Sequence, residues 1–313
     1  MSHASALKVH QINSNYFELY LMHTKFNSFK KLIFVFLFTP MKKLFFPLLT
    51  LCLLFSTSCS DDEGDDSGTK VLLFSTEDDK MLGKQLKQQI FNDTTGQFPL
   101  LDSVQYASAY AYIRALKDSV LKSGEVDYDD EFAWEVYIIQ DDNTLNAFAA
   151  PGGYLYFYTG LIKYLDNEDD LMGVMGHEIA HADLRHSVQQ MQKQYGIQFL
   201  LSALLGNDNS QVTQILAGLA GNAASLKFSR DDETEADLAS VEYLAPLAYR
   251  CDGAATFFKK LAAQGAGGGP TFLSTHPAPT DRVEAITQKA LEIGCDTNYF
   301  APASYDVFVN SLP

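Results

Sequence analysis

Residues 177–181 read His-Glu-Ile-Ala-His, and this motif constrains the fold more than any other feature of the sequence. The motif lies in a segment, residues 168–192, whose apolar side chains recur with helical spacing, which predicts one continuous amphipathic helix. His177 and His181 are four positions apart, so they lie one turn apart on the same face of that helix. Whatever fold the chain adopts, both imidazoles must point to one place.

The spacing of the two histidines suits a metal site. Two imidazoles one turn apart can bind a single zinc ion, with zinc–nitrogen distances of about 2.0–2.1 Å. Glu178 is rotated by about 100° from His177 around the helix axis, which keeps its carboxylate beside the metal instead of bound to it. From there Glu178 can accept a proton from a water molecule that zinc has made more acidic, so we interpret it as a general base. The alternative is a solvated helix face that carries two histidines by chance.

A catalytic zinc site needs a third protein ligand and an open fourth position. Residues 229–237, which read Ser-Arg-Asp-Asp-Glu-Thr-Glu-Ala-Asp, open a later predicted helix that runs to about residue 244. Glu233 and Asp237 lie on a common face of that helix, whereas Glu235 points roughly the opposite way. This spacing offers a ligand, but it does not choose between Glu233 and Glu235. The alternative is an acidic helix start that the helix dipole favours.

Patterns elsewhere in the sequence predict an α+β fold that is mostly helical. Helices are expected at residues 77–91 and 103–122, and over most of residues 159–294. Strands are expected at residues 132–139, 146–149 and 154–158, with Pro-Gly-Gly at 151–153 as the turn between the last two. We expect these short strands to form one small antiparallel sheet.

Several of these segments together resemble peptidase family M48, a family of zinc metallopeptidases. The resemblance is carried by residues 146–154, 177–181, 233–237, 274–277 and 281–282, and it extends from about residue 77 to residue 291. It implies a zincin-like domain in which the small antiparallel sheet lies beside the motif helix. It also implies peptidase activity with one zinc ion per chain.

The resemblance assigns roles to individual residues around the motif. His177, His181 and Glu233 would bind the zinc ion, and Glu178 would be catalytic. Asp237 would orient a ligating histidine or assist proton transfer. The choice between the two glutamates therefore rests on the resemblance, which gives Glu235 no role.

Two further segments receive hypotheses from the same resemblance. One strand would form the sheet edge to which an extended peptide substrate adds, and a packed hairpin is the alternative; its residues are Asn146, Ala147, Phe148 and Ala149. His276, which precedes a proline, resembles a reversible fourth zinc ligand that blocks the water position in some relatives. The alternative for His276 is a turn residue that caps the final helix.

The first 75 residues are expected to direct export of the protein and to anchor it to a membrane. Residues 41–58 begin Met-Lys-Lys, continue with an apolar run and end in small residues before Cys59, the pattern of a bacterial lipoprotein signal peptide. We expect lipidation of Cys59, an acidic disordered tether over residues 59–75 and the metallopeptidase domain over residues 76–313. We interpret residues 1–40 as an upstream segment that is untranslated in the natural protein or disordered. An uncleaved anchor is the alternative to the signal peptide.

Cys251 and Cys295 are the two cysteines of the expected domain. Two cysteines in an exported domain are compatible with one disulfide. Two free buried thiols are the alternative.

The composition narrows the classes of function. With 23 Lys and Arg against 39 Asp and Glu, the formal net charge is -16, which argues against nucleic-acid partners. The mean hydropathy of -0.08 argues against a polytopic membrane protein. We therefore expect a zinc endopeptidase of the bacterial cell envelope that hydrolyses misfolded or misassembled proteins. A lipid anchor alone would hold it to the membrane, on the periplasmic side of the outer membrane or displayed at the cell surface.

A second class of function stays open. The protein could be a non-catalytic envelope chaperone or assembly lipoprotein in which zinc only stabilises the fold. Structural zinc sites usually fill all four positions with protein ligands, mostly cysteines. The expected domain has no cluster of cysteines, and a structural site would give Glu178 no role, so we favour the enzyme.

Overall fold

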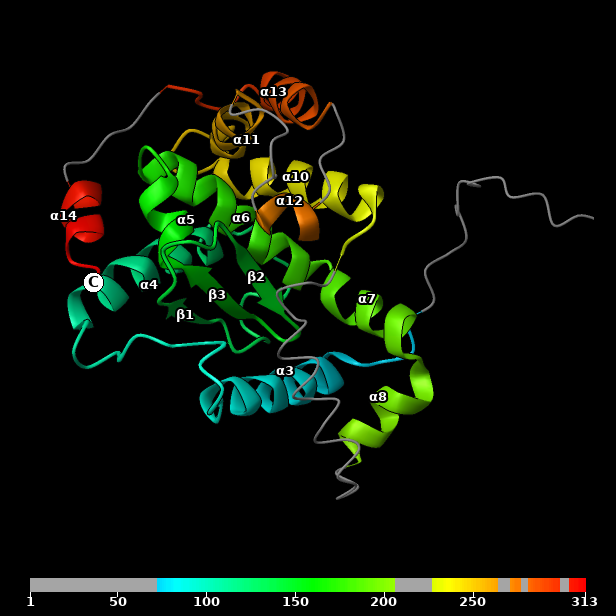
Figure 1. The fold of residues 1–313 in the computed structure, drawn as a ribbon. Coiled ribbons are helices and arrows are strands. Elements are labelled where there is room, and N and C mark those ends of the chain that lie inside the picture. The colour runs from blue at the N-terminus through cyan, green and yellow to red at the C-terminus, as the bar shows by residue number, and fades with distance from the viewer. Residues whose placement is uncertain (1–71, 206–226, 264–270, 277–280, 299–303) are drawn as a thin grey trace, which may run out of the picture. The chain divides into compact units, whose positions relative to one another are not determined.

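A three-stranded sheet lies at the centre of the fold, with helices on both of its faces (Figure 1). The structure is a computed structural model, and it describes residues 72–205, 227–263, 271–276, 281–298 and 304–313. All of them belong to one compact unit, Thr69–Pro313. The predictions for residues 1–40, for the signal peptide and for Cys59 lie outside the described residues, as does the tether up to residue 71.

The sheet is mixed, and its strands are β1 (Glu135–Ile139), β2 (Ala147–Ala150) and β3 (Tyr154–Tyr158) in the order β1-β3-β2. β2 and β3 form an antiparallel hairpin, as the turn signal predicts, but β1 pairs with β3 in parallel. The α+β class is confirmed, whereas the expectation of a purely antiparallel sheet is corrected. After β1, the loop of residues 140–146 leads to β2, which forms the opposite edge of the sheet. The hairpin turn then places β3 between β1 and β2, where it pairs with both strands.

Two glycines make the hairpin turn. Gly152 and Gly153 have φ angles of 73° and 83°, in the left-handed region that residues with a side chain rarely adopt. A Cβ atom on Gly152 would also lie 2.7 Å from the Cα of Lys80, so a helix passes directly over the turn. The turn thus fixes both the end of β2 and the position of the first described helix.

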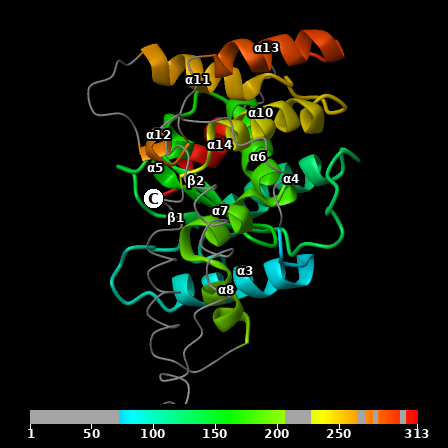
Figure 2. The same ribbon diagram turned by 90° about the vertical axis from the view of Figure 1, so that its right-hand side faces the viewer.

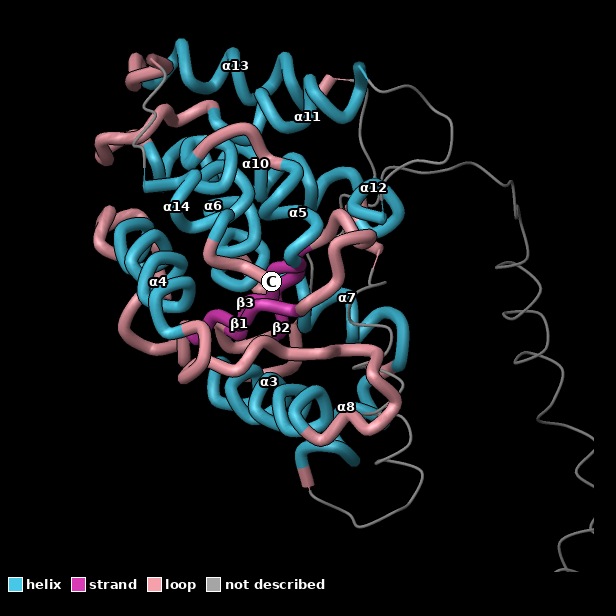
Figure 3. Tube along the Cα trace, turned by 60° about the vertical axis from the view of Figure 1, so that its left-hand side comes forward, coloured by secondary structure: helices cyan, strands magenta, loops and turns pink. Residues whose placement is uncertain are grey.

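Eleven helices surround the sheet in the described residues. Their bounds are α3 Thr76–Phe91, α4 Ala107–Leu121, α5 Thr159–Tyr164, α6 Glu168–Asp183, α7 His186–Tyr195, α8 Ile197–Leu204, α10 Arg230–Leu244, α11 Gly253–Ala263, α12 Thr271–Thr275, α13 Arg282–Ile293 and α14 Ser304–Asn310. In Figures 2 and 3, α3 covers one face of the sheet, α4 and α6 cover the other, and α10, α11 and α13 stack beyond α6. Over the described ranges, none of these helices has the length and apolar character that a bilayer crossing needs.

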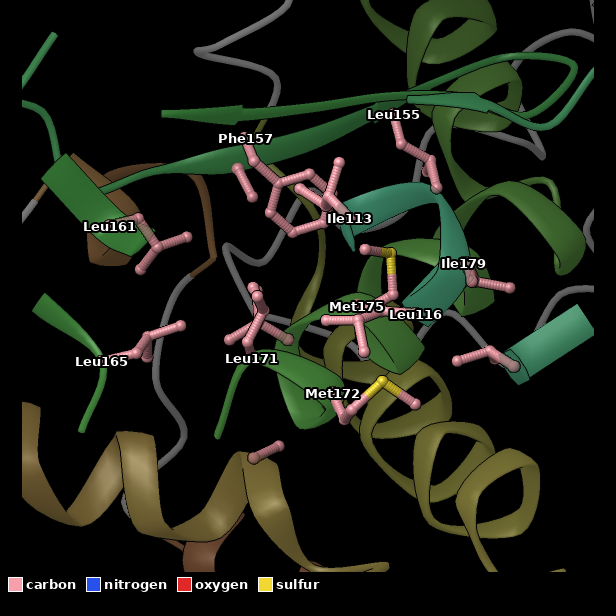
Figure 4. Close-up of a cluster of buried hydrophobic side chains, with 14 of the residues drawn as sticks. Ile113, Leu116, Leu155, Phe157, Leu161, Leu165, Leu171, Met172, Met175 and Ile179 are labelled. Carbon is pink, nitrogen blue, oxygen red and sulfur yellow. The ribbon is translucent and has the colours of Figure 1, made fainter. Parts of the chain in front are cut away.

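Both faces of the sheet are buried, which explains why β3 carries no polar alternation. Leu155 and Phe157 point to the face covered by α4 and α6, whereas the tyrosines of β3 point to the face covered by α3. Figure 4 shows the cluster of buried side chains between the sheet and helices α4 and α6, in which Leu155 and Phe157 lie near Ile113 of α4 and Met175 of α6. Burial of each such side chain stabilises the fold by about 1.5–3 kcal/mol. The motif helix is therefore fixed between the sheet and α10.

The predicted continuous helix over residues 168–192 is wrong. α6 ends at Asp183, and α7 starts at His186 after Arg185, whose φ of 62° lies in the left-handed region. The guanidinium of Arg185 binds the carboxylate of Asp79 through two hydrogen bonds of 2.7 and 3.0 Å and also donates to the carbonyl of Phe74. These bonds offset a backbone strain of about 1–3 kcal/mol. The helical pattern of the sequence could not reveal a break that depends on a residue in α3.

Cys251 and Cys295 are joined by a disulfide, with a sequence separation of 44. In the chain-entropy model, closing a loop of this length stabilises a folded domain by about 4 kcal/mol. We expect reduction to lower the free energy of unfolding by up to this amount, measured by urea unfolding of the full-length chain with and without a thiol reductant. The matched control is the double variant Cys251→Ala, Cys295→Ala, whose stability should not respond to the reductant. A wild-type protein that is equally insensitive would contradict the prediction.

Candidate metal centre

The motif helix α6 presents both of its imidazoles inside the protein. The side chain of Asn167 caps the helix by accepting a hydrogen bond from the backbone N–H of Asp170 at 2.9 Å. His177 and His181 are buried, and their Nε2 atoms lie 3.0 Å apart. The structure therefore brings the two motif histidines to one point, as their spacing predicts.

Helix α10 adds Glu233 to the same point. Ser229 caps this helix in a capping box with Asp232, which fixes where the first turn starts. Glu233, in that first turn, is fully buried, and its Oε1 lies 3.5 Å from the Nε2 of His181. Its Oε2 lies 3.6 Å from the Nε2 of His177.

His276, directly after α12, adds a fourth donor. Its Nδ1 lies 3.0 Å from Oε1 of Glu233 and 3.3 Å from Nε2 of His177. The ring stacks on Phe272 at a centroid distance of 4.3 Å, and it is fully buried. The structure thus places His276 in the cluster, while the N-cap position of α13 belongs to Asp281.

The four donor atoms fit a tetrahedral cation. Zinc bound at about 2.0–2.1 Å from each of four tetrahedral ligands separates those ligands by about 3.3 Å. Five donor pairs are 3.0 to 3.6 Å apart, with Oε1 of Glu233 facing His181 and His276 and Oε2 of Glu233 facing His177. Three imidazole nitrogens and one carboxylate oxygen are also the ligand types that zinc takes in proteins. These residues can therefore hold a divalent cation.

The charge states of His181 and Glu233 match those of metal ligands. Burial, with a contribution from His177, holds the pKa of His181 well below its usual range, so its imidazole is neutral. Burial alone would raise the pKa of Glu233, but His276 and His181 beside it lower that pKa well below the usual range. A neutral imidazole and an ionised carboxylate are the forms that bind metal.

Glu178 is fully buried beside the cluster, and neither of its carboxylate oxygens has a hydrogen-bond partner among the described residues. Its Oε1 lies 3.5 Å from the Nε2 of His276. Burial raises the pKa of Glu178 above its usual value, although the neighbouring histidines act in the opposite direction. A buried carboxylate with free acceptor oxygens needs a hydrogen-bond donor, and a water molecule at the cluster would supply one.

Asp237 and Arg282 hold the other side of His177. The Nδ1 of His177 lies 3.0 Å from Oδ1 of Asp237. Arg282 donates to both oxygens of Asp237 at 2.6 Å and pairs with Oε2 of Glu233 at 2.8 Å. The guanidinium lies 3.8 Å from the centroid of the Phe258 ring. Arg282 therefore orients two carboxylates of the site at once.

Arg282 had no predicted role. It stands at the start of α13, which is distant in the sequence from both motifs, so no spacing rule could link it to them. The only signal was the Asp-Arg pair at residues 281–282 that contributes to the family resemblance. Glu235 was likewise left without a role, although in the structure it contacts His186, which in turn contacts His181.

The candidate substrate strand forms one edge of the sheet. β2 covers residues 147–150 and packs beside α6, and Asn146 precedes it in a fully buried position. The hydroxyl of Ser187 donates to the carbonyl of Ala149 at 2.6 Å, and the N–H of Phe272 donates to the carbonyl of Leu145 at 2.8 Å. The edge is therefore in contact with α12 and α7 in this structure.

A comparison with protein families covers the residues of this site. The model of peptidase family M48 matches residues 108–290, more than half of the chain. The chain belongs to peptidase family M48. The match contains both motifs and all four residues of the buried cluster, His177, His181, Glu233 and His276.

Three similar proteins are named as proteases, which is consistent with membership of this family. The mitochondrial metalloendopeptidase OMA1 of Schizosaccharomyces pombe is 29% identical over 211 residues, which cover 66% of this chain and 60% of the relative. The metalloprotease YcaL of Escherichia coli is 31% identical and shares 50% of this chain and 61% of its own length. The beta-barrel assembly-enhancing protease of Escherichia coli is 31% identical over 49% of this chain and 34% of its own length. The chain thus spans about a third to three fifths of these relatives.

Proposed function

We propose that this protein is a zinc-dependent endopeptidase of the bacterial cell envelope that hydrolyses misfolded or misassembled proteins. The observation that carries the proposal is the buried cluster of His177, His181 and Glu233 beside the carboxylate of Glu178, which has no hydrogen-bond partner among the described residues. A metal site alone would not need Glu178. A buried acceptor at hydrogen-bond range of a metal's open position is what peptide hydrolysis requires.

Each residue of the cluster has a part in this proposal. His177, His181 and Glu233 would bind zinc, which lowers the pKa of a water molecule and polarises the substrate carbonyl. Glu178 would take the proton of that water molecule and later give a proton to the leaving amine. Asp237 would hold the ring of His177 through its Nδ1, and Arg282 would keep Asp237 in place by its hydrogen bonds.

The edge strand β2 is the proposed binding site for an extended peptide. The N–H of Tyr158 donates to the carbonyl of Asn146, so the main chain at residues 146, 148 and 150 faces β3. The main chain of Ala147 and Ala149 therefore faces away from the sheet. A substrate could pair with these groups as an added strand, provided that α12 and the Ser187 hydroxyl release part of the edge.

The location and the substrates are proposed from the sequence and from a relative. The expected signal peptide and the lipidation of Cys59 would place the protein on the periplasmic side of the outer membrane or at the cell surface. One similar protein is named a beta-barrel assembly-enhancing protease. We therefore propose proteins of the outer membrane that fail to assemble as the class of substrate.

The competing function is a chaperone or assembly lipoprotein with a structural zinc site. The position of His276 favours it, because four protein ligands would close the site to water. Cleavage of casein by the full-length protein separates the two functions. If the wild type cleaves casein and Glu178→Gln with equal zinc content does not, the protein is a peptidase. Zinc binding without cleavage by either protein would support the structural role.

His276 would regulate the peptidase as a reversible fourth ligand. We expect His276→Ala to raise the rate of casein cleavage about tenfold if about one tenth of the wild-type molecules are open at any time. The rate is measured at saturating zinc, with zinc content determined in the same samples. Ser274→Ala, at an exposed position of α12, the helix that ends just before His276, serves as the matched control. Loss of zinc together with loss of activity in His276→Ala would show a permanent ligand and contradict the proposal.

A further inference from the structure

The two imidazoles of the motif are supported in different ways. The Nδ1 of His177 faces a carboxylate directly, that of Asp237. The Nδ1 of His181 instead lies 3.1 Å from the Nδ1 of His186, and the Nε2 of His186 lies 3.0 Å from Oε2 of Glu235. We propose that His186 and Glu235 are positioning residues, which hold the ring of His181 in the orientation and tautomer that zinc binding needs. This inference rests on the zinc site proposed above.

The positions of the ring protons follow from the side that faces the metal. The Nε2 of His181 points into the cluster, 3.0 Å from the Nε2 of His177, so it must carry a lone pair when it binds zinc. The ring proton of His181 is then on Nδ1, which donates to the Nδ1 of His186. His186 accepts there and carries its own proton on Nε2, which donates to the carboxylate of Glu235. Each ring nitrogen then has a partner of the correct kind.

The break between α6 and α7 is what turns His186 toward His181. On a continuous helix, a residue five positions later would lie about 140° around the axis and face another direction. The left-handed Arg185 ends that helix, and His186 becomes the first residue of α7. Both sequence neighbours of His186 are anchored, Arg185 by Asp79 and Ser187 by the carbonyl of Ala149. The strain at Arg185 therefore has a consequence at the metal centre.

We call the chain of contacts from His181 through His186 to Glu235 the relay. Glu235 can contact His186 because it does not share a helix face with Glu233. Two positions along α10 correspond to about 200° of rotation, so Glu233 points to the metal side and Glu235 to the outer side of the helix. The side chain of His186 is 1% exposed, whereas that of Glu235 is 54% exposed. Asp232, with Oδ1 at 3.9 Å from the Nε2 of His186, is a weaker second acceptor nearby. The relay therefore runs from the buried cluster to a carboxylate at the surface.

A second cation at His186 is the competing interpretation, since His186, Asp232 and Glu235 together could hold a metal ion. A cation on the Nε2 of His186 would require the ring proton on its Nδ1. That proton would meet the proton on Nδ1 of His181, because the two nitrogens are only 3.1 Å apart. Zinc on His181 and a cation on His186 thus exclude each other, and the relay is the arrangement that zinc binding at the motif allows.

The test is the zinc affinity of the full-length protein, measured by competition with a chelator. We expect His186→Leu to raise the dissociation constant about 10–100-fold, the range found when partners of ligating histidines are removed. Glu235→Leu should raise it by up to about tenfold, because Asp232 can replace part of the contact. Glu235→Gln should stay near the wild-type value, because its amide oxygen still accepts from His186. Glu242→Leu, on the same helix with a side chain 46% exposed, is the matched control.

The absorption spectrum of the Co²⁺-loaded protein gives a second readout. It should change in His186→Leu and stay as in the wild type in Glu242→Leu, since only the relay contacts a ligand. Wild-type affinity in His186→Leu, or equal losses in Glu235→Leu and Glu242→Leu, would overturn the inference. If thermal unfolding shows that His186→Leu does not fold, the three surface variants decide the matter. Because affinity is measured without substrate, a wild type that binds zinc but leaves casein intact rejects the peptidase and not the relay.

Discussion

Glu178→Gln should lower the rate of casein cleavage by about 10²–10⁴-fold, the range attributed to a positioned general base. The substitution keeps the size and shape of the side chain but removes its ability to accept a proton. Zinc content should stay the same, because Glu178 is not among the four convergent donors of the cluster. The measurement is kcat for casein cleavage by full-length protein, together with zinc content in the same sample.

The free energy of unfolding should not fall in Glu178→Gln. A loss of activity in this variant would therefore reflect a loss of catalysis and not a loss of folded protein. Glu178 is fully buried without hydrogen-bond partners for its carboxylate among the described residues, and burial raises its pKa. A neutral amide at this place avoids the free energy of burying a charge. The matched control is Glu168→Gln, the same change at a buried position of the same helix that is hydrogen-bonded to Tyr112. Equal activity in Glu178→Gln and the wild type would remove Glu178 from the mechanism.

Local patterns in the sequence predicted the elements well where contacts are local. The start of the motif helix, the start of α10 and the strand β3 lie where the sequence patterns predict them, and Asn167 and Ser229 cap the two helices. The pair of imidazoles is local as well, because one helical turn separates them. Its geometry is fixed by the helix itself and needs no tertiary information.

The features that the sequence patterns did not predict depend on contacts between segments that are distant in the chain. The end of α6 depends on Asp79, which binds Arg185 from a helix that starts about 100 residues earlier in the chain. The parallel pairing of β1 with β3 depends on the route of a loop, and strand periodicity is the same in both directions. Arg282 and His276 enter the site from the C-terminal part of the fold. Only the family resemblance pointed to His276, and it gave Arg282 no role.

Glu233→Ala should remove most of the zinc affinity. If about 10–16 kcal/mol of zinc binding is shared among four ligands, each contributes about 2.5–4 kcal/mol, or a factor of about 10²–10³ in the dissociation constant. The loss should be larger than this share suggests, because Arg282 would then lie near the metal with one of its two carboxylates removed. The measurement is the zinc dissociation constant by chelator competition, followed by casein cleavage at increasing free zinc.

The zinc dependence of activity distinguishes a lost ligand from a lost base. High free zinc should partly restore cleavage by Glu233→Ala, because binding is what the variant lacks. The same zinc concentration should not restore Glu178→Gln, whose site is already filled. Glu242→Ala, an exposed carboxylate on the same helix, controls for the change of charge and should bind zinc as the wild type does. If Glu233→Ala kept both its zinc and its activity when the chelator is in excess, Glu233 would not be a ligand, and the assignment of the metal centre would have to be given up.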